Sequence, residues 1–120
     1  MGRKNVQSEL LGILSTALGG VEVRTSVPDP RPRELVVVRR EGGSMRNALI
    51  DAPGIGIDIW AGSEARACEI AEAVSGTMLS LGFSDGYASV KEEAFLSQYD
   101  TRSGTPHWYA SYSLRTFQTR

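Results

Sequence analysis

The stretch that decides the fold runs from residue 54 to residue 82 and reads GIGIDIWAGSEARACEIAEAVSGTMLSLG. Isoleucine occupies every second position from 55 to 59, and a period of two predicts a β-strand with one face in the core and a mixed opposite face. Apolar residues then recur every three or four positions up to Leu81, which predicts an amphipathic helix. Ser63 is a favourable N-cap residue, and Gly82 is expected to end the helix. The stretch therefore predicts a strand that leads directly into a helix over residues 63–81.

The chain before this stretch predicts one more helix and two strands. Apolar residues at helical spacing indicate a helix over 5–18, followed by a half-buried strand over 21–27. The three prolines of 28–32 cannot continue a helix or a central strand, so this segment connects two strands. The sequence LVVVRR at 35–40 is apolar on both faces, as is typical of a strand inside a sheet.

The remaining segments complete a single domain. Residues 44–52 have no clean period and predict an extended loop or a long hairpin tip, whereas 88–94 and 108–114 predict strands joined by a turn over 97–106. The order is α-β-β-β-α-β-β. We therefore expect one α+β domain over residues 1–120, with a mixed, mainly antiparallel sheet and two helices packed on one face.

Composition argues against several classes of protein. Hydrophobic residues make up 41% and charged residues 22%, which is typical of a globular protein, and no run approaches the roughly 20 apolar residues of a membrane span. Cys68 and His107 are the only cysteine and histidine, which argues against a disulfide or a zinc cluster. No phosphate-binding glycine loop is present. We expect no catalytic, cofactor or metal site, and a protein made and kept in the cytoplasm.

Charge is unevenly distributed along the chain. Residues 24–46 hold six arginines against three acidic residues, a net charge of +3, whereas residues 58–100 carry a net charge of −6. Because acidic residues interrupt the arginines, and because arginine is enriched in protein interfaces, a protein partner fits this pattern better than nucleic acid. Opposite charges on separate segments favour head-to-tail contacts between copies of the chain.

The candidate interface residues combine this charge with exposed apolar character. The apolar residues of 44–52 would supply most of the affinity, because exposed ion pairs contribute only about 0–1 kcal/mol each. The candidates are Arg39, Arg40, Met45, Arg46, Leu49, Ile50, Asp58 and Trp60.

Several of these features occur together in a known family. They are the run from Leu35 to Arg39, then Gly42-Gly43, Asn47, Asp51 and Pro53, the strand end Ile59-Trp60-Ala61, the helix that begins after Ser63, and a closing aromatic strand over 107–112. Together they resemble the tail terminator proteins of long-tailed phages and prophages, particularly of actinobacterial hosts. The resemblance spans roughly residues 5–117.

The resemblance implies a role in virion assembly. Proteins of this family form a hexameric ring at the head-proximal end of the tail tube, stop tube growth and present a surface to the head–tail connector. The implied partners are the chain itself, the tail tube protein and the connector, without a cofactor, catalysis or membrane, and without required nucleic-acid contact. The implied location is the virion, and the host cytoplasm during assembly.

The sequence leaves two alternative functions open, and one segment differs from the family pattern. Another neck, head–tail joining or minor tail protein would share these features. A small ligand-binding domain or hydrolase would instead need a pocket in which Asp58, Trp60 and Tyr112 converge. Residues 44–52 are more apolar than a free loop, so this segment either contacts a neighbour or packs on its own sheet.

Overall fold

A computed structural model describes residues 5–84, 86–99, 102 and 104–117 of the chain. Two of the acidic residues counted above, Asp85 and Asp100, lie outside this part. The elements are α1 (Val6–Ala17), β1 (Glu22–Arg24), β2 (Leu35–Gly42), β3 (Ile50–Asp51), β4 (Gly54–Trp60), α2 (Glu64–Ser80), the 3-10 helix η1 (Leu81–Phe83), β5 (Tyr87–Ser97) and β6 (His107–Phe117).

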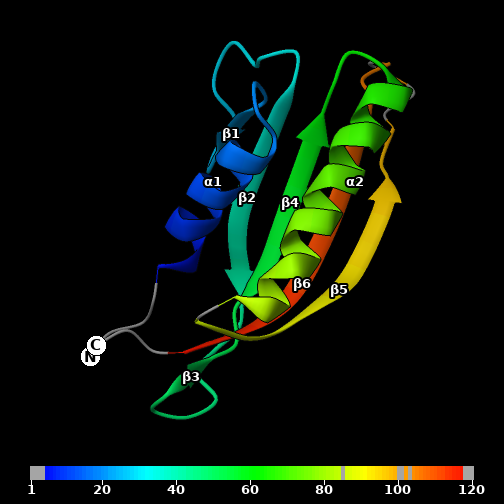
Figure 1. Ribbon diagram of the computed structural model, residues 1–120. Helices are drawn as coiled ribbons and strands as arrows, with labels where there is room; N and C mark the ends of the chain where they lie inside the picture. The colour runs from blue at the N-terminus through cyan, green and yellow to red at the C-terminus, as the bar shows by residue number, and fades with distance from the viewer. Residues whose placement is uncertain (1–4, 85, 100–101, 103, 118–120) are drawn as a thin grey trace.

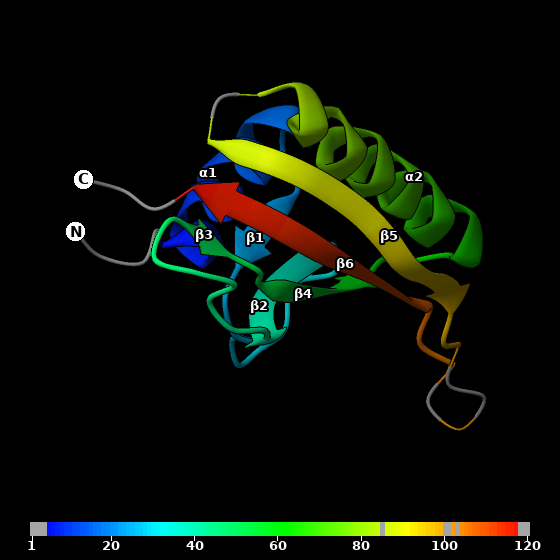
Figure 2. The same cartoon turned by 90° about the horizontal axis from the view of Figure 1, so that it is seen from below.

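The strands form one curved sheet with both helices on the same side (Figures 1 and 2). The strand order is β1-β2-β4-β6, with β5 along the other edge of β6 and the short β3 at the end of β6. The β1–β2 pair is parallel, and the other pairs are antiparallel. This confirms the predicted α+β class, the mixed sheet and the order of helices and strands.

The core lies between the two helices and the sheet. Leu10 and Leu14 of α1 pack into the same apolar cluster as Ile57 of β4 and Val74 of α2, and all four side chains are fully buried. Helix α2 begins as predicted, because the Ser63 hydroxyl oxygen accepts a hydrogen bond from the backbone N–H of Arg66 at 3.1 Å. Burial of the period-two and period-3.6 apolar faces against each other therefore determines the fold.

The second face of the sheet, which no helix covers, is called the outer face below. Because alternate residues of a strand point to opposite sides, Asp58 and Trp60 face outward while the β4 isoleucines face the helices. This side of β4 is more buried than the sequence predicts, since Asp58 is only 6% exposed. The cause is the central position of β4 between β2 and β6, which brings outer-face side chains from both neighbours over it.

Candidate functional site

A hairpin arm projects beyond the lower end of the sheet (Figure 1). It comprises residues 43–52, between the end of β2 and the start of β4, and it contains β3. Gly43 allows the arm to form, since its φ is +86° and an added Cβ would lie 1.9 Å from the Ala52 carbonyl oxygen. A side chain at this position would push the two legs of the arm apart.

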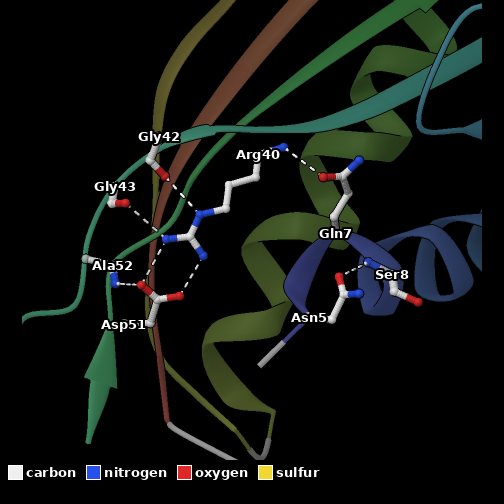
Figure 3. Close-up of polar contacts among 8 residues, drawn as sticks. All are labelled: Asn5, Gln7, Ser8, Arg40, Gly42, Gly43, Asp51 and Ala52. Atoms are coloured by element: carbon white, nitrogen blue, oxygen red, sulfur yellow. Dashed lines mark hydrogen bonds and ion pairs between the residues drawn. The ribbon is translucent and has the colours of Figure 1, made fainter. Parts of the chain in front are cut away.

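An ion pair fixes the base of the arm to the sheet (Figure 3). The guanidinium of Arg40 donates to both carboxylate oxygens of Asp51, at 2.6 and 2.9 Å, and to the carbonyl oxygens of Gly42 and Gly43, each at 3.1 Å. The Asp51 side chain is 1% exposed. This carboxylate raises the pKa of Arg40 through the hydrogen bond, so the guanidinium stays charged. The arm is thus held in one orientation.

Helix α1 contacts the same base. The backbone N–H of Arg40 donates to the side-chain oxygen of Gln7 at 3.4 Å, and the side chain of Asn5 caps α1 by accepting from the N–H of Ser8 at 3.1 Å (Figure 3). The arm, the end of β2 and the first turn of α1 therefore meet at one place.

The tip of the arm presents an apolar side chain on an ordered turn. The side-chain oxygen of Asn47 accepts from the backbone N–H of Leu49 at 2.8 Å and of Ile50 at 3.0 Å, and the N–H of Arg46 donates to the Ile50 carbonyl at 2.7 Å. Leu49 is nevertheless 55% exposed. The side chain of Arg46 is exposed and has no ion pair with any described residue.

The structure shows one of the two alternatives that the sequence leaves open for residues 44–52, packing on the chain's own sheet. Ile50 pairs with Phe117 of β6, and Met45 forms a bridge with Asp51, so one part of the segment packs on its own sheet. Leu49 and Arg46 point away from that packing, as their exposure shows. These two side chains are therefore available to another molecule.

A second group of candidate residues forms an outer-face cluster of Arg39, Asp58, Trp60 and His107. The Asp58 carboxylate pairs with Arg39 and also accepts from Nε2 of His107 at 2.8 Å, which places a proton on Nε2. The His107 ring stacks on Trp60 with centroids 4.6 Å apart, and the Arg31 guanidinium lies 5.4 Å from the Trp60 ring centre. The polar groups of this cluster use one another as partners.

The outer face also has a groove of about 640 Å³ beside the arm. Its lining includes Arg46 of the arm, Lys91 of β5 and Arg115 of β6. Asp58 and Trp60 are not part of it. The hydroxyl of Tyr112 donates to Glu92 at 2.9 Å on the helix side of the sheet, and burial raises the pKa of this hydroxyl.

The pocket that a small hydrolase or ligand-binding domain would need is therefore not formed by Asp58, Trp60 and Tyr112, since these side chains lie on opposite faces of the sheet. Within the described residues, no group of three or more His, Cys, Asp or Glu side chains is placed to hold a metal ion. No helix in this part of the chain has the length and apolar character to cross a membrane.

The eight candidate residues separate into the two groups just described. Arg39, Asp58 and Trp60 belong to the outer-face cluster, and the other five belong to the arm or its base. Arg39 and Arg40 each have an acidic partner in their own chain, which leaves Arg46 as the arginine among the candidates that is available for an acid of another copy. The sequence did not indicate that His107 and Asp51 form ion-pair or hydrogen-bond contacts in these two groups. The register of the strands determines their partners, and no local sequence pattern indicates that register.

Comparisons with known proteins agree on fold only. No family model matches the chain, and no curated protein matches it. Among solved structures, a chain from the virion of a native gene transfer agent particle is similar, with a TM-score of 0.64 and 17% sequence identity. The match covers 87% of this chain and 84% of that one, so the two share their fold over nearly their whole length.

Proposed function

We propose that the chain is a structural protein of a phage-like virion and acts as a tail terminator, which forms a ring at the head-proximal end of the tail tube, stops tube growth and joins tail to head. The observation that carries the proposal is the fold shared with a gene transfer agent virion chain over 87% of the sequence. The resemblance of residues 35–61 and the following helix to tail terminators, found from sequence alone, points to the same class.

The surface of the subunit is better suited to contacts with other proteins than to catalysis. The acids and arginines of the outer-face cluster are already paired with one another, and the groove beside the arm is lined by scattered side chains of both charges. By contrast, the arm holds an exposed leucine on an ordered turn, which costs little conformational entropy to bind. In this proposal the partners are other copies of the chain, the tail tube protein and the connector, and no cofactor or catalytic step is needed.

One alternative has support from the same observation. A neck, head–tail joining or minor tail protein other than the terminator would also share its fold with a virion chain. The two roles differ in what happens when the protein is missing. A terminator is needed to limit tube length, whereas a joining protein is needed only to attach a finished tail to the head.

The test is electron microscopy of tails assembled with and without the chain. A particle that lacks a tail terminator is expected to produce tubes of uncontrolled length with open ends, and expression of the chain from a plasmid is expected to restore uniform, capped tails. Capped tails of normal length in its absence would rule the terminator role out. Finished but unattached tails would favour the joining role.

A further inference from the structure

The exposed side of α2 carries a line of residues that continues into η1. Glu72, Gly76, Leu79 and Phe83 follow one another at steps of four, three and four, which places them along one side of a helix. Leu79 is 43% exposed and Phe83 is 95% exposed, the largest exposure of any large apolar side chain in the described residues. An apolar pair at the end of a helix is thus left uncovered in the single subunit.

Gly76 leaves room on this side of α2 for a side chain of a neighbouring molecule. Glycine in the interior of a helix is unfavourable relative to alanine, and nothing inside the subunit requires it, because an added Cβ would meet no atom within 4 Å. It leaves a notch in the helix surface between Glu72 and Leu79. Gly12 of α1 has equally open surroundings, but no large exposed apolar side chain lies on α1, so it provides a matched control.

The arm has the complementary properties. Leu49 is 55% exposed at its tip, three residues from the unpaired side chain of Arg46. Residues 43–50 contain this one charged residue, whereas α2 contains three glutamates and one arginine. Arg66 pairs with Glu69 and Glu34, and Glu64 accepts hydrogen bonds from the side chains of Ser97 and Trp108. Glu72 is exposed and has no side-chain partner among the described residues. The tip of the arm is therefore apolar and basic, and the surface of α2 is apolar and acidic.

The two surfaces lie at the same end of the molecule but on opposite sides of the sheet (Figures 1 and 2). Figure 2 shows the arm with β3 and the end of α2 separated by the strands β5 and β6. Contacts that use two different patches are heterologous, and they close into a ring when the rotation between subunits allows it. A two-fold dimer would instead bring the same patch of both copies together.

We infer that the arm of one copy docks on the α2 surface of the next, with Leu49 beside Leu79 and Phe83 at the notch of Gly76, and with Arg46 toward Glu72. The inference rests on the proposed ring and identifies its subunit contact. The occupant of this surface is thus a second copy of the chain, and a tail tube or connector protein on the same surface is the competing outcome.

The first test compares Gly76→Gln with Gly12→Gln by thermal unfolding and by light scattering over a concentration series. Both changes are expected to leave the fold intact and the unfolding midpoint equal to or above that of the wild type, because glutamine favours a helix more than glycine. Only Gly76→Gln is expected to weaken self-association, by tenfold or more. Equal association of the two variants would overturn the inference.

The second test identifies the two surfaces directly. Ala48 and Ala73 are exposed next to Leu49 and Glu72, so a cysteine at either position keeps the apolar contact. Ala48→Cys and Ala73→Cys are made separately in a Cys68→Ala background, mixed in equal amounts and treated with a short bis-maleimide. The linked dimer is expected in the mixture and not in either variant alone. A wild type that associates while the mixture stays unlinked would overturn the contact and leave the proposed function standing. A chain that stays monomeric, and whose absence leaves tails normal, would overturn both.

Discussion

At the scale of single residues, the base of the arm depends on a buried charge pair. The Asp51 side chain is 1% exposed and that of Arg40 is 22% exposed. Taking two charges out of water is costly, so the pair contributes little net free energy, but the loss of Arg40 removes an opposite charge and two hydrogen bonds from a buried carboxylate.

Arg40→Leu is therefore expected to lower the free energy of unfolding by about 3 kcal/mol. The double variant Arg40→Leu, Asp51→Leu is expected to recover part of this loss, because no buried charge remains. Urea unfolding of the three proteins measures both effects. A single variant as stable as the wild type would show that the pair does not hold the arm.

Trp60 connects three parts of the outer face. Its ring lies against His107 and Arg31, so it joins β4, β6 and the loop before β2. Trp60→Ala is expected to lower the free energy of unfolding by about 3 kcal/mol, and Trp60→Phe, which keeps an aromatic ring in the stack, by less than half of that. Chemical denaturation of the alanine and phenylalanine variants measures both losses. An alanine variant with unchanged stability and unchanged association would refute both a packing role and an interface role for Trp60.

At the scale of elements, the helices and the central strands could be predicted because their patterns are local. The isoleucine alternation of β4 and the Ser63-capped stripe of α2 each indicate an element without reference to the rest of the chain. The sequence predicts a long hairpin tip over 44–52 as one of two possibilities, but it does not predict strand β3 within it, since β3 has two residues and forms only because Ile50 and Asp51 reach the far end of β6. Strand β1 is also shorter than the alternation of 21–27 predicts, and its last apolar residue, Val27, is 48% exposed.

The candidate site residues of the arm that the sequence predicts are those that lie outside any periodic pattern. Exposed apolar and charged residues at 45–50 stand out in the sequence because no periodic element contains them. The exposure of Phe83 does not stand out, since a phenylalanine is ordinarily buried and the predicted helical pattern ends at Gly82, before this residue.

The N-cap of α2 provides a test at this scale. Ser63→Ala is expected to lower the free energy of unfolding by about 1 kcal/mol, because the N–H of Arg66 loses its acceptor, and Ser63→Asp is expected to retain it. Thermal and urea unfolding check both variants. Equal losses in alanine and aspartate would mean that the cap does not hold the start of the helix.

At the scale of the whole molecule, association should depend more on apolar contact than on charge. In the proposed contact Arg46 and Glu72 are both exposed, so their pairing contributes only about 0–1 kcal/mol and is screened by salt. Raising the salt concentration is expected to weaken self-association only partly, whereas Leu49→Ser is expected to abolish it at the same protein concentration. Sedimentation at low and high salt measures this, and complete dissociation by salt alone would contradict an apolar contact.

The central claim is that the chain forms the ring that ends the tail tube. Cryo-electron microscopy of the head–tail junction of assembled particles tests it most directly. The predicted result is a single closed ring of this chain between the tail tube and the connector, with the arm of each copy on α2 of the next. Density for the chain along the tube, at the distal tip of the tail or nowhere in the particle would contradict the claim.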